Sequence, residues 1–237
     1  MLLLGNNMKV YIGTSGWLYD WNEGGNFEWF VKNSELNSVE LNASFYRFPF
    51  PNQIKSWAEK SGNIRFSVKV HRKITHILKL NTSAITVWND FQTLFAPLED
   101  KIDFYLFQMP PSFSPDYLDR VKKFFSNINN RKKAAIEFRH SDWFNEEMVR
   151  EIEKAGIVFV SIDSPQIQSF IVKTNNIIYL RFHGREVWYN YDYSKKEMKD
   201  TCEKIYCLKP DSIYAYFNND HDMLFNAREF YNMLKYK

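Results

Sequence analysis

The sequence predicts an α/β fold, a single (β/α)8 TIM barrel, on the strength of two observations. The first is an alternation of eight apolar, strand-like runs with helical segments between most of them, which indicates parallel strands joined by crossover helices. The second is that polar residues fall at the carboxyl ends of those runs, where a closed barrel brings them to one mouth. An open doubly wound sheet is the alternative, and it would leave several of these residues far apart.

Length and composition agree with one such domain. The chain has 237 residues, and we expect residues 9–237 to form the barrel behind a short N-terminal extension, residues 1–8. Hydrophobic residues make up 45% of the chain, which supports a large core and argues against disorder. The formal net charge of +3, without a long basic run, makes nucleic acid a disfavoured partner. No run of apolar residues approaches membrane-spanning length.

The two cysteines indicate packing rather than chemistry. Cys202 and Cys207 lie close together and lack the second pair that a metal cage needs. Cys202 follows Met198 by four residues and precedes Ile205 by three, the spacing of a buried helix face. We expect a reducing compartment and a cytoplasmic protein.

The first half of the chain contains four strand–helix units. Strands are expected at residues 10–13, 38–42, 65–70 and 104–107, with helices near 27–31, 51–61, 83–98 and 114–125. Pro51 is typical of a first helical turn, and Gly62 ends that helix. Ser114 and Pro115 form an N-cap and first-turn pair.

The second half repeats the pattern with one exception. Strands are expected at residues 135–140, 158–163, 177–183 and 212–217, with helices near 148–155, from 195 onward, and near 227–234. Ser194 and Glu197 have the spacing of a capping box. The connection between strands six and seven, residues 166–176, is too short for a convincing helix, so we expect an irregular unit there.

Acidic side chains and a histidine at the strand ends are the candidate catalytic residues. They are Glu40, Glu137, Asp163 and His183. Because side chains alternate across a strand, we expect the three acids to face one another and to serve as general acid and base. Two alternatives stay open: a divalent metal held by these residues, or a structural ion network with nearby basic residues. The near balance of charge at the mouth disfavours the metal.

Basic and polar residues at the same ends are the candidate substrate-binding residues. They are Thr14, Ser15, Trp17, Asn42, Lys69, His71, Gln108, Arg139, Arg181 and Asn218. The two arginines and the lysine make a clamp for a carboxylate or a phosphate. The first loop adds hydroxyl groups but lacks the lysine and spacing of a P-loop.

We expect different roles for the other histidines and the tryptophans. His71 has the inward parity of its strand, whereas His140 has the outward parity and is expected to cap a loop. His76 lies on a long connection that can fold over the mouth. Trp17 and Trp143 follow strand ends, where stacking on a sugar or base and simple packing are equally plausible.

Motifs in order along nearly the whole chain resemble the domain-of-unknown-function 72 family, also called YecE-like proteins. They are GTSGW at 13–17, VELNASFY at 39–46, QMPPSF at 108–113, EFRH at 137–140, DSP at 163–165, RFHG at 181–184, and FNN at 217–219 with NA at 226–227. The resemblance implies a TIM barrel and no established activity. The stretch 220–225 is shorter than is usual in that family and has no glycine, which puts Asn226 in doubt as a site residue.

The sequence therefore predicts an enzyme that binds a small anionic, sugar- or nucleotide-like substrate at the carboxyl-end mouth and uses acid–base chemistry. One alternative is a divalent-metal-dependent phosphoesterase or isomerase, which rests on fold analogy. The other is a non-catalytic module that binds nucleic acid or protein through an exposed basic or aromatic groove. The sequence indicates neither a cofactor nor an oligomeric state.

Overall fold

Eight parallel strands close into a barrel in chain order in the computed structural model, which describes residues 8–167 and 169–235. The strands are β1 Lys9–Thr14, β2 Ser38–Leu41, β3 Arg65–Lys69, β4 Ile102–Gln108, β5 Ala134–Glu137, β6 Val158–Asp163, β7 Ile177–Phe182 and β8 Ser212–Phe217. The barrel closes because β1 pairs with β8 in register from Lys9↔Ser212 to Thr14↔Phe217 and also pairs with β2. The predicted TIM barrel is confirmed, and the open doubly wound alternative is excluded.

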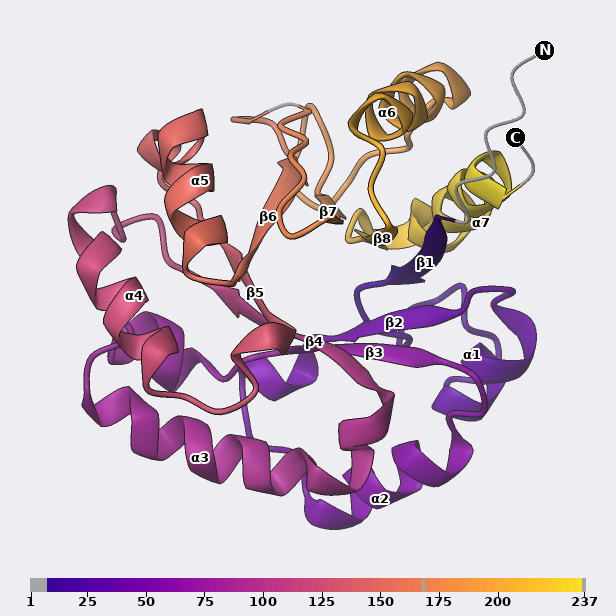
Figure 1. The fold of residues 1–237 in the computed structure, drawn as a ribbon. Coiled ribbons are helices and arrows are strands. Elements are labelled where there is room, and N and C mark those ends of the chain that lie inside the picture. The colour runs from indigo at the N-terminus through magenta and orange to yellow at the C-terminus, as the bar shows by residue number, and fades with distance from the viewer. Residues whose placement is uncertain (1–7, 168, 236–237) are drawn as a thin grey trace.

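Helices form an outer ring around the strands (Figure 1). They are α1 Phe27–Asn33, α2 Pro51–Lys60, α3 Ser83–Phe95, α4 Leu118–Ser126, α5 Glu146–Lys154, α6 Lys195–Leu208 and α7 Met223–Lys235. Short 3-10 turns lie at Ala43–Phe45, Ala96–Lys101, Pro115–Tyr117, Arg131–Lys133, Ser141–Trp143 and Asp220–Asp222, and a π-helical turn lies at Lys73–Ile77. Most of these short turns lie between a strand and the helix that follows it.

Two apolar layers follow from the alternation of side chains along each strand. Inside the barrel, Leu106, Ile162 and Tyr179 belong to one buried cluster. The neighbouring strand residues, such as Phe107 and Phe159, belong to a larger core between the strands and the helices. The parity of a residue within its strand therefore decides whether its side chain points to the barrel axis or to the helices.

Local sequence signals set several helix boundaries. The Ser194 hydroxyl accepts from the Glu197 backbone N–H and the Glu197 carboxylate accepts from the Ser194 backbone N–H, the predicted capping box that begins α6. Pro51 is the first residue of α2, as predicted. The helix expected from Ser114 begins instead with a 3-10 turn before α4, because the first turn of a helix often tightens.

The connection between β6 and β7 forms no helix in its described residues, as the sequence predicts. Phe170 makes an isolated antiparallel bridge with Ile162, and Thr174 makes one with Ile177. The backbone N–H groups of Phe170 and Ile162 donate to each other's carbonyls at 3.2 Å. The segment therefore folds back along β6 in place of a crossover helix.

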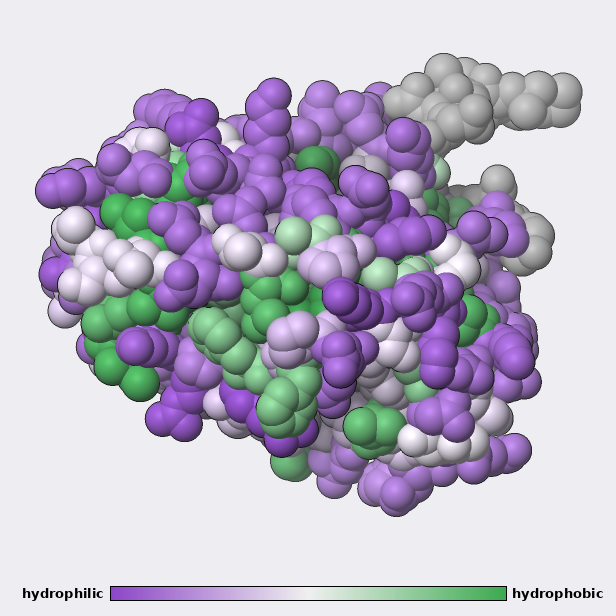
Figure 2. Space-filling view, turned by 90° about the horizontal axis from the view of Figure 1, so that it is seen from below, coloured by the Kyte–Doolittle hydropathy of each residue, from purple (hydrophilic) through white to green (hydrophobic). Residues whose placement is uncertain are grey.

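Several smaller expectations can be compared with the structure. Of the predicted N-terminal extension, residues 1–8, only Met8 lies within the described residues. Cys202 is buried in α6, as predicted, and Cys207 is exposed. No helix of the described chain is long and apolar enough to cross a membrane. The face seen in Figure 2 is mainly hydrophilic with hydrophobic patches interspersed, which is common on folded protein surfaces.

The outer core makes the first testable prediction. Phe91 of α3 is fully buried and packs against Phe95 and Trp88, whereas Phe50 is 66% exposed. The variant Phe91→Ala should lose about 3–5 kcal/mol of unfolding free energy, because it leaves a cavity. Phe50→Ala is the matched control and should change stability by no more than about 0.5 kcal/mol. Denaturant unfolding measures both; equal midpoints for the two variants would contradict this packing.

Candidate functional site

Arg181 lies at the centre of a buried ion network at the carboxyl ends of the strands. From β7, its Nη2 donates to Glu40 Oε1 on β2 and its Nη1 donates to Glu137 Oε2 on β5, each at 2.6 Å. None of the three side chains has exposed surface. Strand parity therefore brings together three of the residues singled out from the sequence, across the barrel axis.

A second guanidinium, that of Arg139, completes the surroundings of Glu137. Arg139 Nε lies 2.5 Å from Glu137 Oε1, and Arg139 Nη2 lies 3.2 Å from His183 Nε2. Arg181 Nη1 approaches the same ring nitrogen at 3.4 Å. Because guanidinium nitrogens only donate, His183 Nε2 must be unprotonated to accept them. On the other side of the ring, the Asn218 side-chain amide lies 3.4 Å from Nδ1.

These contacts hold Glu137 and His183 each in one protonation state at neutral pH. Burial raises the pKa of the Glu137 carboxyl, but Arg139 and Arg181 outweigh burial and lower that pKa well below its usual value. Burial, reinforced by the same guanidinium groups, lowers the pKa of His183 to about 3. Glu137 is therefore a fixed carboxylate and His183 a neutral imidazole, which weakens the acid–base roles expected of them.

Lys69, on β3, differs from Glu137 and His183 in that its protonation state is not fixed near neutral pH. Its Nζ lies 4.3 Å from the centroid of the Phe45 ring, and no carboxylate of the described chain lies within ion-pair distance of it. Burial, followed by repulsion from Arg181, lowers the pKa of Lys69 to about 7. The side chain therefore titrates close to neutrality, where a group that transfers protons works best.

A layer of hydroxyl groups lies beneath the charges. Ser15 Oγ donates to Glu40 Oε1 at 2.9 Å, and the Tyr179 hydroxyl donates to Glu40 Oε2 at 2.8 Å. Ser67 Oγ lies 2.5 Å from the Tyr179 hydroxyl. Burial raises the pKa of Tyr179 well above its usual value, so the phenol stays protonated and donates. Both oxygens of Glu40 are thus satisfied by protein donors.

A hollow of about 620 Å³ opens beside this network, a size that suits a small molecule. Its lining residues are Gln108, Pro111, Arg139, His140, Ser141, Gln166, Ile167, Trp188 and Tyr189. The Arg139 guanidinium lies 4.5 Å from the centroid of the Trp188 ring, a cation–π contact at the edge of the hollow. Arg139 therefore joins the hollow to the buried network.

Asp163 does not face Glu40 and Glu137, so this expectation from the sequence is wrong. Ile162 carries the inward parity of β6, and Asp163 therefore points outward. Its Oδ2 accepts from Arg185 Nε at 2.8 Å and its Oδ1 accepts from the Ser169 backbone N–H at 2.9 Å. Asp163 holds the connection between β6 and β7 to the loop after β7.

Three predicted binding residues also lie away from the mouth. Thr14 has the outward parity of β1 and donates to the Gly16 carbonyl at 2.7 Å. Trp17 is 6% exposed and packs against Phe27 in the outer core, so its stacking role is wrong. His71 lies two residues beyond the end of β3, and its ring packs edge-on against Phe48.

The remaining candidates lie at or near the mouth. Asn42 follows β2 with the inward parity of Glu40, and its buried Oδ1 has no hydrogen-bond donor among the described residues. His76 lies in the π-helical turn with its ring edge-on to Phe45. His140 accepts from the Asp142 backbone N–H at 3.4 Å, the loop-capping role expected of it.

Three residues that contact the predicted site residues were not singled out from the sequence: Tyr179, Arg185 and Trp188. Tyr179 shares the inward parity of Arg181, and that parity was a sufficient signal to find it. Arg185 and Trp188 lie on the loop between β7 and α6, where no periodicity predicts the direction of a side chain. Asn226, doubted because of the short loop before α7, is buried, and its Oδ1 accepts from the Tyr193 backbone N–H at 3.1 Å, a structural role.

The expected metal alternative finds no set of donors in the described residues. No three His, Cys, Asp or Glu side chains among them come together in a way that could hold a metal ion. Both glutamates at the mouth pair with a guanidinium group, whose positive charge disfavours a metal ion beside them.

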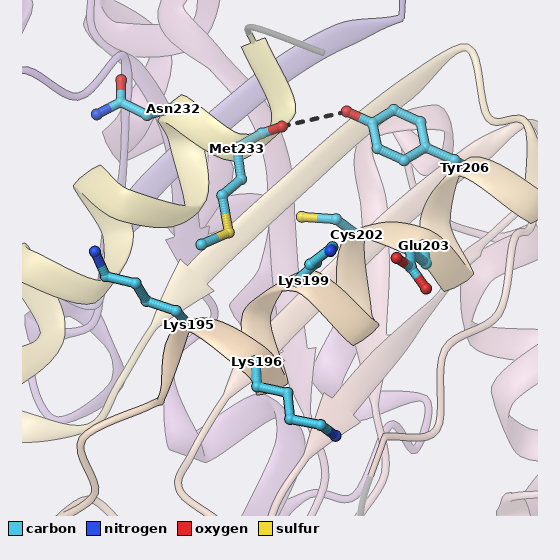
Figure 3. A pocket seen from close by; sticks show the side chains of 8 residues that line it. All are labelled: Lys195, Lys196, Lys199, Cys202, Glu203, Tyr206, Asn232 and Met233. Atoms are coloured by element: carbon cyan, nitrogen blue, oxygen red, sulfur yellow. Dashed lines mark hydrogen bonds between the residues drawn. The ribbon is translucent and has the colours of Figure 1, made fainter.

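A second hollow, of about 450 Å³, lies on the outer surface between α6 and α7 (Figure 3). Cys202, Tyr206 and Met233 lie among its lining residues, and the Tyr206 hydroxyl donates to the Met233 carbonyl at 3.5 Å. No strand end contributes to it, so it is separate from the mouth.

Three comparisons place this geometry among known proteins. A family model described as "Protein of unknown function DUF72" matches residues 11–237. The UPF0759 protein YecE of Escherichia coli K12 is 26% identical over 169 residues, which cover 68% of this chain but only 61% of YecE. The crystal structure of a DUF72 family protein from Thermotoga maritima is 27% identical with a TM-score of 0.82, over 96% of this chain and 99% of that chain. One from Enterococcus faecalis, 20% identical with a TM-score of 0.77 and 96% coverage of both chains, shows the fold alone.

The ion network makes the second prediction. Arg181→Met should cost about 3–5 kcal/mol of unfolding free energy, because Glu40 is left as a buried charge with only hydroxyl donors. Arg150→Met, which breaks an exposed pair with Glu146, is the matched control and should change stability by about 0.5 kcal/mol or less. Adding Glu40→Gln to Arg181→Met should restore part of the loss, since it removes the unpaired charge. Denaturant unfolding at pH 7 compares the four proteins, and an Arg181→Met variant as stable as the control would refute the network.

Proposed function

The chain belongs to the DUF72 family of proteins of unknown function, and from the geometry of its barrel mouth we propose that it is an enzyme that binds a small anionic substrate there. The observation that carries the proposal is the charge balance of the mouth. Two guanidinium groups, of Arg139 and Arg181, neutralise two carboxylates, of Glu40 and Glu137. Lys69 adds a further cation that no carboxylate of the described residues neutralises, so the mouth attracts an anion when Lys69 is protonated.

The hollow beside the network gives the substrate its size and shape. Gln108 and Arg139 present hydrogen-bond donors to it, and Trp188 presents an aromatic ring. A carboxylate or phosphate group would contact Arg139 and Lys69, while a sugar or base would stack on the tryptophan. These contacts support a sugar- or nucleotide-like anion.

The acid–base roles expected from the sequence change in one respect. Glu137 stays ionised and His183 stays neutral near pH 7, so they position the arginines rather than transfer protons. Lys69, whose pKa is about 7, is the better candidate to donate or accept a proton. The bound anion would hold Lys69 protonated, and its departure would release the proton.

Sulfate binding tests the anion site and makes the third prediction. Sulfate stays a dianion between pH 5 and 9, so any change in affinity over that range belongs to the protein. Because Lys69 is protonated below its pKa of about 7, the affinity should be highest below pH 7 and should weaken as the pH rises through that value. Lys69→Met should weaken binding about 10- to 100-fold at pH 6, the value of a charge-assisted hydrogen bond.

Isothermal titration measures these affinities. Lys73→Met removes an exposed lysine on the loop after β3 and is the matched control, expected to bind like the unaltered protein. Sulfate affinity that is flat with pH, or equal in the two lysine variants, would count against the proposal.

A nucleic-acid partner is the second candidate, because aromatic and basic side chains alternate on an exposed rim loop. Tyr46 and Phe50 are 70% and 66% exposed on the loop between β2 and α2, with the exposed Arg47 between them. Aromatic side chains beside cations are typical platforms for single-stranded nucleic acid.

The fourth prediction concerns the binding of a labelled oligothymidylate, which fluorescence anisotropy measures. Phe50→Ala should weaken binding about fivefold or more, since a base stacked on an aromatic ring contributes about 1–3 kcal/mol. Phe225→Ala, an exposed phenylalanine at the start of α7, is the matched control and should bind as before. The affinity should also fall steeply with salt. Absence of binding at low salt eliminates this candidate.

A further inference from the structure

Lys69 has a combination of features that anion binding alone does not require. We propose that Lys69 is an amine nucleophile that forms an imine with a substrate carrying both a carbonyl group and a carboxylate or phosphate group. The inference rests on the proposed anion site and names the chemical class of its substrate: an anionic aldehyde or ketone.

The position of Lys69 is the first argument. β3 places Ser67 toward the barrel axis, where its hydroxyl contacts Tyr179, and Lys69 lies two residues later on the same side. Lys69 is therefore on the axis side of β3, one inward position nearer the carboxyl end than the hydroxyl layer, and its Nζ lies 4.3 Å from the centroid of the Phe45 ring. A substrate held by Arg139, two residues after β5, would reach across to it, because β3, β4 and β5 are neighbours in the barrel.

The absence of a carboxylate partner is the second argument. Elsewhere in the molecule lysines pair with acids; Lys133, for example, donates to Glu99 at 2.7 Å. At the mouth the acids are already bound, since guanidinium groups take Glu40 and Glu137. Among the described residues Lys69 Nζ has only the Phe45 ring as a close partner. Its nitrogen is free to approach a substrate carbon.

The charges around the amine are the third argument. A lysine that is desolvated or lies beside another cation loses its proton more easily and becomes a nucleophile. Lys69 has both features: it is largely buried, and Arg181 and Arg139 repel its charge. With a pKa of about 7, roughly half of the amine is neutral at pH 7, whereas an ordinary lysine of pKa about 10.4 is almost entirely protonated.

The step needs no reagent beyond the substrate. The lone pair of Nζ forms a bond to the carbonyl carbon while the carbonyl π electrons move to the oxygen, which takes a proton from the nitrogen. The carbon–oxygen bond of the resulting carbinolamine then breaks, its hydroxyl leaves with the remaining proton of the nitrogen as water, and the nitrogen lone pair forms a carbon–nitrogen double bond. The product is an iminium ion when protonated, and the neighbouring Glu40 and Glu137 carboxylates would stabilise its positive charge.

Reductive trapping tests the proposal on the intact protein. Glyoxylate, a two-carbon aldehyde with a carboxylate, is added with cyanoborohydride, and the tryptic peptides are mapped by mass. Modified Lys69 resists trypsin, so its adduct appears in the peptide of residues 66–72, whereas an adduct of the exposed Lys73 appears in residues 73–79. At pH 7 we expect Lys69 to be trapped at least about tenfold faster than Lys73, because far more of its amine is neutral. We also expect sulfate to slow trapping at Lys69 but not at Lys73.

The outcomes separate this inference from the proposed function. Sulfate binding together with preferential Lys69 trapping supports both. Sulfate binding without preferential trapping overturns the imine and leaves the anion site. Preferential trapping by glyoxylate and by uncharged acetaldehyde alike, without sulfate binding, supports the nucleophile and overturns the anionic substrate. The absence of both sulfate binding and preferential trapping overturns both the imine and the anion site. Lys69→Arg keeps the cation without the amine, so it should still bind sulfate; its loss of sulfate binding would show that the charge alone does not make the site.

Discussion

The bridge that Arg181 makes between Glu40 and Glu137 is the constraint on which the rest of the mouth depends. One guanidinium joins carboxylates from β2 and β5 across the axis of the barrel, at 2.6 Å on each side and with no exposed surface. Charges buried in this way are costly unless each is paired and hydrogen-bonded, and here the fork of the guanidinium meets both requirements. The strands that supply the three residues must therefore hold their register for the charges to coexist.

This pairing also determines which groups remain available for chemistry. Arg139 and Arg181 keep the Glu137 carboxylate ionised, and burial together with the same two guanidinium groups keeps the imidazole of His183 neutral. Burial lowers the pKa of Lys69, the positive charge of these arginines lowers it further, and no carboxylate of the described residues lies within ion-pair distance of its amine. The ion network thus lowers the pKa of the neighbouring Lys69 amine.

Strand parity explains both the successes and the failures of prediction from the sequence. It placed Glu40, Glu137 and Arg181 correctly because each lies within a strand whose apolar neighbours reveal the inward face. Every residue of β6 is buried, so its apolar run gave no sign that Ile162 and not Asp163 faces inward. His71 lies beyond the end of β3, where the alternation no longer applies.

The positions of side chains on loops could not be predicted, because loops lack the alternation that strands have. Arg185 and Trp188 occupy positions that depend on partners distant in the chain, Asp163 and Arg139, and no local pattern encodes a pair separated in this way. Their position after strand ends identified Trp17 and Trp143 as candidates for stacking, whereas Trp188 was not singled out. The sequence did not indicate which of them would join the outer core, as Trp17 does, and which would reach the mouth.

The polar layers inside the barrel hold the charged groups of the mouth in place. Glu40 accepts from Ser15, Tyr179 and Arg181, so each of its oxygens is satisfied before any ligand arrives. Tyr179 in turn contacts Ser67 at 2.5 Å, which ties the charged layer to the interior of the barrel. Groups that are already satisfied do not reorganise when a ligand binds, and preorganised charge is more effective than charge that must move into place. Lys69 keeps its hydrogen-bonding capacity unused within the described chain, so a ligand gains most by binding to it.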